Sequence, residues 1–472
     1  MHPRSVPIDP SYRPTSPSLT AAAEANRRGI ALRAAGRPDD AIAAFRDGLA
    51  NEAGAAELHG NLAITLDEAG QRDAARDAYA AALQIDPAFV PAHLGLGSLD
   101  VRAAQYERAE AHYRRAVAVD PDNVTANLAL YELAQIAGRN DEALAFQLCA
   151  LRRQQLFSQV APRERRRILV LMAPGSWQAN TPVNFLVDPE TTTLHTLYLL
   201  GKDELEELAL PPCDLIFNAI GESDEAPPAL ELASTVIARL GLPYLNAPQR
   251  VLVTNRVALV DALEGIDGCV VPPIARISRE TVAARLLPVD VPFIIRPVDS
   301  HAGHDLARID ALGELDAYLE RAAQGEFYVS PFVDYRSSDG FYRKYRIICV
   351  GGEPFAYHLA ISPNWMIHYY NAPMREHAWM RAEEERYLAD FHGVFGEALQ
   401  RALRDVASTI GLEYFGIDCS IDQDGRLLIF EADPAMIVHV NDDPELFGYK
   451  HRYVPRIFAA LERLIDSYAR SN

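Results

Sequence analysis

The alternation of hydrophobic and polar residues between residues 412 and 434 predicts a β-hairpin. Every second residue from Ile417 to Ile421 is apolar, and a second apolar run extends from Leu427 to Phe430. A period of two is typical of strands that bury one face. The pair Asp424-Gly425 lies between the two runs and is a common turn pair of hairpins.

Three carboxylates are expected on one face of this hairpin. Successive side chains of a strand point to opposite faces, so Glu431 and Asp433 share a face, and Asp418 on the partner strand can face them. Converging carboxylates repel one another unless a cation lies between them. Hard oxygen ligands suit Mg²⁺ or Mn²⁺, which commonly accompany nucleotide phosphates. The pattern therefore predicts a metal site at these three residues; the alternative is a solvated polar face.

A second pattern, with a strict period of 34 residues, occupies the N-terminal third of the chain. Small residues at fixed helical positions let two helices cross closely, an aromatic residue fills the gap to the next unit, and proline ends the second helix. The recurring positions are Ala41, Ala75, Ala109 and Ala143; Gly36, Gly70, Ala104 and Gly138; Gly29, Ala63 and Gly97; Phe45, Tyr79 and Tyr113; and Pro87 and Pro121.

This period resembles the tetratricopeptide repeat, and the segment GNLAITLDEAGQRDAARDAYAAALQIDP at residues 60–87 is a close match. Four units are expected from Ala22 to Phe157, within a repeat domain at residues 20–157, with less regular first and last units. The resemblance implies an all-α solenoid whose groove binds a peptide or a protein. The alternative is a dimerisation or packing module, so a homodimer is left open. The proline-rich residues 1–19 are expected to be a disordered lead-in.

Composition narrows the partners and the compartment. A net charge of −20 argues against nucleic acid or an anionic membrane as the main partner. The five cysteines are scattered without a CxxC pair, which suits a reducing cytoplasm and argues against a disulfide framework or a zinc site. No signal-peptide pattern and no long apolar run is seen, so a cytoplasmic protein is expected.

From Arg165 onward the pattern changes to alternating strands and helices. Buried strands are predicted at residues 166–174, 213–220 and 242–246, with a helix at Pro228–Leu240. No GxGxxG follows the first strand, so a dinucleotide site is not expected. The later elements are a helix opening within residues 244–263, a strand–loop–strand unit at residues 292–309, and strands within residues 327–335 and 344–361.

This order of elements, together with the hairpin, resembles the ATP-grasp superfamily, nearest to its glutathione-synthetase and ribosomal-protein glutamate-ligase branch. The resemblance covers roughly residues 165–464. It implies a multidomain chain in which the repeats precede a small α/β domain (165–250) and an ATP-grasp domain of α/β (α+β) type (251–472). That domain would have a central part at 251–325 and a C-terminal part at 326–472.

The resemblance also implies a metal and ATP. The family's Gly-x-Asp strand and Glu-x-Asn end supply the magnesium ligands, which here are Asp418, Glu431 and, in place of the asparagine, Asp433. Two lysines that contact the phosphates in the family correspond to Arg256 and Arg296 here. The planar guanidinium group of arginine thus replaces the flexible ammonium group of lysine. The extended segment from Ser330 to Val333 would read adenine through its backbone, and Asp334 would bind the ribose. The residues implied to bind ATP are Arg256, Arg296, Ser330, Pro331, Phe332, Val333, Asp334 and Lys344.

Other positions depart further from the family. The implied catalytic residue is Arg346, which would steady the transferring phosphoryl group and the oxyanion; two positions before it the family often has an acid, but this chain has Lys344. The phosphate loop corresponds to Ser300–His304, where a single glycine remains and His301 and His304 are either donors or ordinary loop residues. Asn371 and His439 fall near the family's substrate positions, with ordinary loop residues as the alternative.

The resemblance implies an ATP-dependent carboxylate–amine ligase that acts through an acyl phosphate, with the repeats recruiting a peptide, carrier or partner protein. Peptide modification is one such activity. The alternative is a catalytically silent ATP-grasp pseudoenzyme that serves as a nucleotide-responsive binding or scaffold protein. A kinase that releases a phosphorylated product is a third reading, which these motifs leave open.

Overall fold

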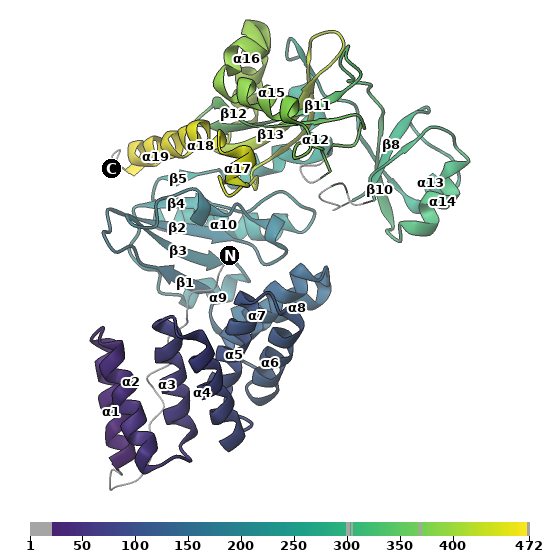
Figure 1. Ribbon diagram of the computed structural model, residues 1–472. Coiled ribbons are helices and arrows are strands. Elements are labelled where there is room, and N and C mark those ends of the chain that lie inside the picture. Colours follow the sequence, from purple (N-terminus) through teal and green to yellow (C-terminus); the bar gives the residue numbers. More distant parts are fainter. Residues whose placement is uncertain (1–20, 299–302, 304, 368–370, 470–472) are drawn as a thin grey trace. The chain divides into compact units, whose positions relative to one another are not determined.

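The computed structural model describes residues 21–298, 303, 305–367 and 371–469, and these divide into two compact units (Figure 1). The N-terminal unit comprises the described residues up to Gln155 together with Pro174–Ser176. The C-terminal unit comprises Leu156–Ala173 and the described residues from Trp177 onward. Within the described residues, no helix combines the length and the apolar character needed to cross a membrane.

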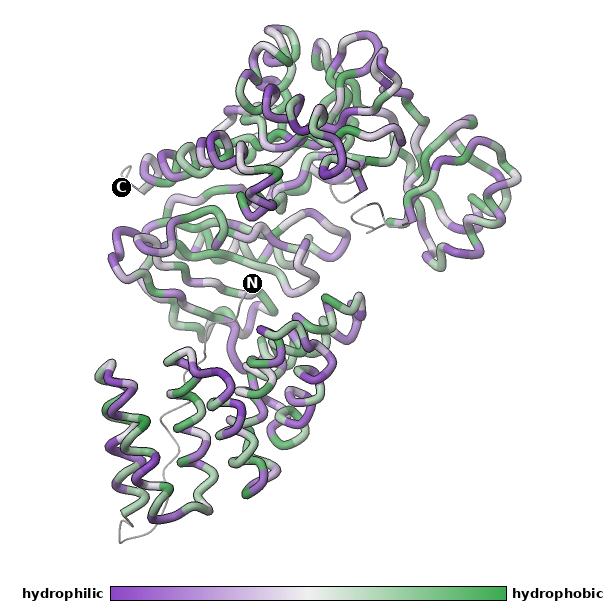
Figure 2. The backbone as a smooth tube through the Cα atoms, viewed as in Figure 1, coloured by the Kyte–Doolittle hydropathy of each residue, from purple (hydrophilic) through white to green (hydrophobic). Residues whose placement is uncertain are grey.

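The N-terminal unit consists of four consecutive pairs of antiparallel helices, which confirms the predicted all-α repeat array (Figure 1). Apolar and polar residues alternate along each helix, so that each buries one side against its neighbours (Figure 2). The helices are α1 (Ala21–Ala34), α2 (Pro38–Asn51), α3 (Ala56–Glu68), α4 (Arg72–Ile85), α5 (Val90–Arg102), α6 (Tyr106–Val119), α7 (Val124–Ile136) and α8 (Asn140–Arg153).

The repeated glycines of this unit give room to the repeated aromatic residues. A Cβ atom added at Gly97 would lie 2.7 Å from Cζ of Tyr113, and one added at Gly29 would meet the ring of Phe45 in the same way. Both aromatic rings are buried. The 34-residue pattern therefore encodes helix packing, as the sequence predicted.

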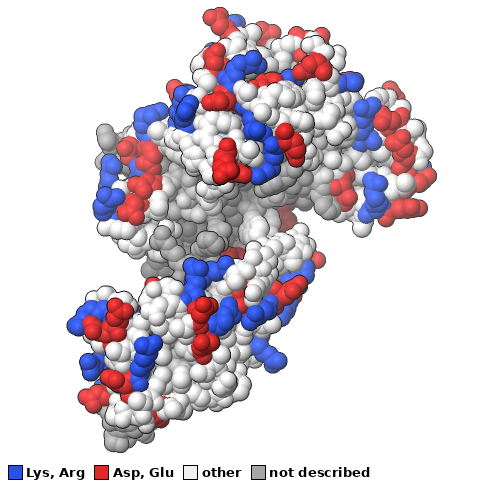
Figure 3. Space-filling model, viewed as in Figure 1, with Lys and Arg blue, Asp and Glu red and all other residues white. Residues whose placement is uncertain are grey.

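Ion pairs link successive repeats on the surface of the N-terminal unit. Arg114 of α6 pairs with Glu142 of α8 at 2.5 Å, and Arg139 before α8 pairs with Glu110 of α6 at 2.8 Å. On the face drawn in Figure 3, acidic and basic side chains are interspersed over these helices and are not gathered by sign. A partner for this face would therefore not be selected by net charge alone.

The C-terminal unit begins with a five-stranded sheet in the order β1-β3-β2-β4-β5. Strands β3, β2, β4 and β5 run parallel, and β1 pairs antiparallel with β3 at one edge. The sequence predicted β2, β4, β5 and α10, whereas β1 and the threonine-rich β3 were not predicted. The elements are β1 (Leu156–Gln159), β2 (Arg166–Met172), η1 (Trp177–Ala179), η2 (Val183–Phe185), β3 (Thr192–Tyr198), α9 (Lys202–Glu207), β4 (Leu215–Asn218), α10 (Ala226–Leu240) and β5 (Tyr244–Leu245).

A four-stranded antiparallel sheet, in the order β7-β10-β8-β9, follows and has its own core. Phe293, Ile295 and Phe327 from its strands pack against Leu315 and Val282 from its two helices. The predicted strand–loop–strand unit is thus present, but positions 300–302 and 304 of its loop lie outside the described residues. The elements are β7 (Ala275–Ser278), α13 (Arg279–Ala283), β8 (Phe293–Pro297), β9 (Ala307–Ile309), α14 (Glu314–Arg321) and β10 (Glu326–Pro331).

A second five-stranded sheet, in the order β12-β11-β13-β14-β6, contains the predicted hairpin. Its strands are antiparallel except for the parallel pair β14 and β6. The strands are β6 (Cys269–Val270), β11 (Tyr342–Val350), β12 (Glu353–Ser362), β13 (Tyr414–Ile421) and β14 (Leu427–Asp433). The helices around the sheet are α11 (Pro248–Val251), η3 (Leu252–Thr254), α12 (Arg256–Leu263), α15 (Ala378–Ala389), α16 (Phe391–Ile410), α17 (Pro444–Phe447), α18 (Lys450–Tyr453) and α19 (Pro455–Ala469).

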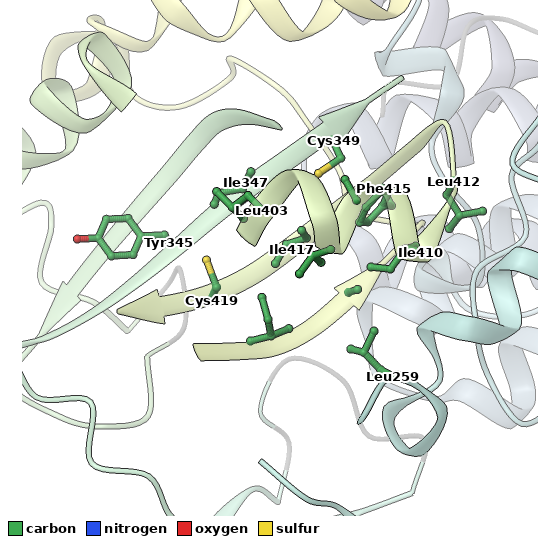
Figure 4. Close-up of a cluster of buried hydrophobic side chains, with 14 of the residues drawn as sticks. Leu259, Tyr345, Ile347, Cys349, Leu403, Ile410, Leu412, Phe415, Ile417 and Cys419 are labelled. Atoms are coloured by element: carbon green, nitrogen blue, oxygen red, sulfur yellow. The ribbon is translucent and has the colours of Figure 1, made fainter. Parts of the chain in front are cut away.

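One face of this sheet is apolar, as the period of two predicted (Figure 4). Ile417 and Cys419 of β13 are buried beside Tyr345 of β11, and Leu403 and Ile410 of α16 lie in the same cluster. The intervening residues of β11 and β13 consequently point to the other face. The predicted multidomain class is confirmed: a repeat solenoid is followed by a small α/β domain and two further sheets.

Candidate functional site

A row of polar and charged side chains crosses four neighbouring strands of the second five-stranded sheet. His358 on β12 is paired with Arg346 on β11, Arg346 with Asp418 on β13, and Asp418 with Glu431 on β14. Directly paired residues share a face of the sheet. Because Cys419 points into the apolar core, this row lies on the opposite face.

Asp418 is the fully buried centre of the row. Nε of Arg346 donates to Oδ1 of Asp418 at 2.7 Å, and Nη2 of Arg346 donates to Oδ2 at 2.9 Å. Nζ of Lys344 lies 2.6 Å from Oδ2. Burial alone would raise the pKa of Asp418, but Arg346 and Lys344 hold that pKa well below its usual range. Asp418 is therefore ionised and accepts hydrogen bonds from two cations.

Glu431 pairs with the arginine that opens α12. The side chain of Asn255 accepts hydrogen bonds from the backbone N–H groups of Val257 and Ala258 and so caps this helix. The cap places Arg256 at the first helical residue, where its Nη2 lies 2.6 Å from Oε2 of Glu431. Burial would raise the pKa of Glu431, but the positive charges of Arg256, Lys344 and Arg296 keep this pKa below its usual range.

Arg296 brings a fourth cation to this group from the neighbouring sheet. It lies on β8, paired with Tyr328 of β10. Burial, followed by the positive charge of Arg256, lowers the pKa of Arg296 to about 10, while Glu431 acts in the opposite direction. The structure thus brings Arg256, Arg296, Lys344 and Arg346 together around two ionised carboxylates.

Asp433 differs from the other two carboxylates. It is paired with Gly416 across the hairpin, and its Oδ1 accepts a hydrogen bond from the backbone N–H of Ala435 at 2.7 Å. Burial raises its pKa to about 6, and the negative charges of Glu431 and Asp418 act in the same direction. Gly416 is required here, because a Cβ atom at this position would collide with Met436.

The three carboxylates lie as the sequence predicted, but their oxygens are engaged by protein groups. Asp418 and Glu431 bind cationic side chains, and Asp433 binds a backbone N–H. Throughout the described part of the chain, no group of three or more His, Cys, Asp or Glu side chains is placed to hold a metal ion. In this arrangement the residues do not fit a three-carboxylate metal centre, and metal binding by Asp418, Glu431 and Asp433 stays a prediction.

The predicted adenine segment begins at the end of β10. Ser330 and Pro331 are the last two residues of that strand, opposite Ile294 and Phe293 of β8. The N–H of Phe332 donates to the carbonyl of Pro292 at 3.1 Å. Because the N–H of Phe332 is already used, a backbone donor to adenine at this end of the segment would come from Val333, the next residue along the chain.

The side chains of this segment form an aromatic and cationic group. The ring of Phe332 meets Trp365 edge to face, with 5.7 Å between centroids, and the guanidinium carbon of Arg308 lies 4.1 Å from the centre of the same ring. Asp334 accepts hydrogen bonds from the N–H and the guanidinium of Arg336, at 3.1 and 2.6 Å. A ribose role for Asp334 would compete with this local pair and stays a prediction.

A buried polar group at the end of the row was not predicted. Oε1 of Glu384 lies 2.5 Å from Nδ1 of His358 and 3.4 Å from Nζ of Lys450, and the hydroxyl of Tyr449 donates to Oε2. Nζ of Lys450 also lies 3.0 Å from Oδ2 of Asp442. Burial would raise the pKa of Glu384, but His358 and Lys450 lower it to about 2. Glu384 stands in an acidic run of a helix, which gives no sequence signal of burial.

His439 and Asn371, which the resemblance places near the substrate, lie in different surroundings. The backbone N–H of His439 donates to the hydroxyl of Tyr357 at 3.1 Å, which places His439 beside the strand that carries His358. Nδ2 of Asn371 donates to the carbonyl of Met366 at 3.2 Å. Asn371 therefore makes a contact within its own loop, and the substrate roles of His439 and Asn371 stay predictions.

Comparisons with known proteins match both parts of the chain. Residues 32–99 and 94–155 match family models described as tetratricopeptide repeat. The crystal structure of MamA has 20% sequence identity and a TM-score of 0.27 over 28% of this chain and 78% of that chain. No curated protein gives a significant sequence match.

Two solved ligases are similar to the remainder of the chain. The VanG D-Ala:D-Ser ligase from Enterococcus faecalis has 13% identity and a TM-score of 0.40, and the D-alanine–D-alanine ligase from Bacillus anthracis, complexed with ATP, has 13% and 0.39. Each match covers 64% of this chain and 99% of the ligase. Because these TM-scores lie below 0.5, function is inferred from the side chains of the site.

Proposed function

We propose that this chain, a tetratricopeptide repeat array followed by an ATP-grasp fold, is an ATP-dependent carboxylate–amine ligase. The observation that carries the proposal is the convergence of Arg256, Arg296, Lys344 and Arg346 around Asp418 and Glu431. Clustered guanidinium and ammonium groups bind phosphate oxygens through charge-assisted hydrogen bonds. A nucleoside triphosphate is the substrate that such a group fits.

The reaction would proceed in two steps. An oxygen of the substrate carboxylate attacks the γ-phosphorus of ATP, and the bond between this phosphorus and the β,γ-bridging oxygen breaks. The products of this step are an acyl phosphate and ADP. The amine nitrogen then attacks the acyl carbon, loses a proton, and expels inorganic phosphate from the tetrahedral intermediate. The protein's main contributions are alignment and stabilisation of the negative charge that moves.

Arg346 is the residue proposed to act on the transferring group. Its guanidinium plane is held by two hydrogen bonds to Asp418, so it is oriented before a substrate arrives. Arg256 and Arg296 would bind the remaining phosphate oxygens. The adenine base would lie along Ser330–Val333, with Val333 donating from its backbone and Phe332 offering a ring.

Magnesium is the ion that the family resemblance brings with ATP. In the present arrangement it would need Asp418, Glu431 or Asp433 to exchange a protein partner for the metal. No step of the proposed reaction is assigned to it. The repeats would recruit the peptide, carrier protein or partner that supplies the carboxylate or the amine.

The proposal is tested by trapping the acyl phosphate. The full chain is incubated with ATP, Mg²⁺, hydroxylamine and a panel of amino acids and short peptides, and hydroxamate and ADP are measured. Arg346→Ala should lower both by at least about a hundredfold, whereas Arg452→Ala should leave them unchanged, because Arg452 is largely exposed. ATP binding without ADP or hydroxamate across the panel would favour the silent pseudoenzyme.

Recruitment by the repeats is tested separately. The hydrophobic clusters of the two units share no residue, so a chain that begins at Gln155 retains the core residues of the C-terminal unit. With a peptide or carrier substrate, this shorter chain should show a raised KM and an unchanged kcat. An unchanged KM would contradict recruitment while leaving the ligase proposal intact.

A further inference from the structure

The residue that replaces a family acid, Lys344, has a defined partner in the structure. Its Nζ lies 2.6 Å from Oδ2 of Asp418, the same oxygen that accepts a hydrogen bond from Nη2 of Arg346 at 2.9 Å. Oδ1 of Asp418 accepts a hydrogen bond from Nε of Arg346 at 2.7 Å. Both oxygens of this fully buried carboxylate are therefore bound by cations that belong to the protein.

Glu431 is arranged in a similar way. Its Oε2 lies 2.6 Å from Nη2 of Arg256, which the capped start of α12 holds in place. Four cations (Arg256, Arg296, Lys344 and Arg346) and three carboxylates (Asp418, Glu431 and Asp433) leave a net charge of +1 when all seven are ionised. A site for a divalent cation would be expected to carry net negative charge.

A cation at Asp418 would also meet direct competition. Magnesium binds carboxylate oxygen at about 2.0–2.1 Å, and an ion on Oδ2 would lie close to the ammonium of Lys344. Like charges at such a distance repel, and exclusion of water strengthens the repulsion. Lys344 thus takes the place of a metal ion beside Asp418.

We propose that Lys344 and Arg256 neutralise the triphosphate in place of divalent ions, so that ATP binds this chain without requiring Mg²⁺. The inference rests on the proposed function, because it concerns the same ATP site. Free ATP carries two more negative charges than its magnesium complex, and a net positive site favours the more highly charged form. Lys344 and Arg256 contact the phosphates, and Asp418 and Glu431 act as positioning residues that aim them.

Calorimetry of ATP binding to the full chain, in EDTA and in Mg²⁺, tests this inference. The wild-type chain should bind ATP in EDTA at least as tightly as in Mg²⁺. Lys344→Glu, which places an acid where the family has one, should weaken binding in EDTA by at least about tenfold and recover part of the loss in Mg²⁺. Arg452→Glu makes the same charge change at an exposed position and should bind as the wild type does in both buffers.

Lys344→Gln covers the case in which the charge reversal prevents folding. It removes the cation without adding an acid, so it should weaken binding in EDTA without a recovery in Mg²⁺; circular dichroism checks its fold. Wild-type binding that occurs only in Mg²⁺ would overturn this inference and leave the proposed function standing. Wild-type chain that binds ATP in neither buffer would overturn both.

Discussion

Arg346 and Asp418 are paired across β11 and β13 and share two hydrogen bonds, at 2.7 and 2.9 Å. The fork of the guanidinium matches the two carboxylate oxygens, so both the distance and the plane of Arg346 are set. The carboxylate is fully buried, and removal of one partner from such a pair leaves an uncompensated buried charge. This pair therefore links the stability of the sheet to the orientation of the proposed catalytic arginine.

Asp418→Asn should destabilise the C-terminal unit by about 3 kcal/mol. The amide cannot balance Arg346 and Lys344, which then remain as neighbouring positive charges. All three tryptophans, Trp177, Trp365 and Trp379, lie in the C-terminal unit. Tryptophan fluorescence during urea unfolding therefore reports on this unit alone.

Asp424→Asn is the matched control for this substitution. Asp424 lies in the exposed turn of the same hairpin and pairs with Arg426 at 2.8 Å on the surface. Its loss should change the free energy of unfolding by less than about 0.5 kcal/mol. Equal effects of the two substitutions would show that the buried pair has no special role in the sheet.

Phe332→Ala should weaken ATP binding by about tenfold or more, because a base stacked on an aromatic ring gains about 1–3 kcal/mol. Phe341→Ala is the control, since both phenylalanines are half-buried and each meets a tryptophan edge to face, at 5.7 and 5.1 Å. Inorganic tripolyphosphate, which has no base, should bind both variants and the wild type alike. A loss of tripolyphosphate binding in Phe332→Ala would indicate damage to the phosphate site and contradict an adenine role.

Gly97→Ala should lower the stability of the N-terminal unit by up to about 2 kcal/mol. Alanine favours a helix by about 1 kcal/mol over glycine, but the new methyl group would lie 2.7 Å from Cζ of the buried Tyr113, and overpacking costs about 1–3 kcal/mol. Far-UV circular dichroism during thermal unfolding measures the change. Gly54→Ala, where the added Cβ meets nothing within 4 Å, should leave the midpoint within about 2 °C.

The hairpin and its carboxylates were predictable because they depend on a local period of two. Asp418 does face Glu431, and the turn does lie at Asp424 and Gly425. The partners of those carboxylates were not predictable, because they come from other elements. Arg256 lies 175 residues before its partner Glu431, and Lys344 lies on β11, the strand beside the one that carries Asp418. The sequence alone predicts a metal site, because it shows the three carboxylates without their partners. The fold shows that cationic side chains from other elements surround Asp418 and Glu431.

The buried group of His358, Glu384 and Lys450 shows the same limit more strongly. Its members come from a strand and two helices, and the nearest two are 26 residues apart. No period or motif connects them. The repeats are the opposite case: the contact between Gly97 and Tyr113 recurs along the chain, so the sequence displays it several times.

Asp433→Asn should stabilise the C-terminal unit at neutral pH and have no effect in acid. In the folded chain burial raises the pKa of Asp433 from 3.8 to about 6, so ionisation opposes folding. The contribution of protonated Asp433 to the free energy of unfolding is fully present below pH 3.8 and is lost as the pH rises through about 6. Asparagine keeps the acceptor for the N–H of Ala435, which now lies 2.7 Å from Oδ1, and removes the charge.

Asp433→Asn should raise the free energy of unfolding by about 1–2 kcal/mol at pH 7.5. This is less than the whole pKa shift of Asp433 would give, because the side chain is partly exposed. Urea unfolding followed by tryptophan fluorescence at pH 4.5, 6 and 7.5, in EDTA, should show the gain growing with pH. Asp424→Asn at the same three pH values should show a flat difference from the wild type. A gain in Asp433→Asn that is equal at all three pH values would mean that packing, and not the buried charge, limits stability at the end of β14.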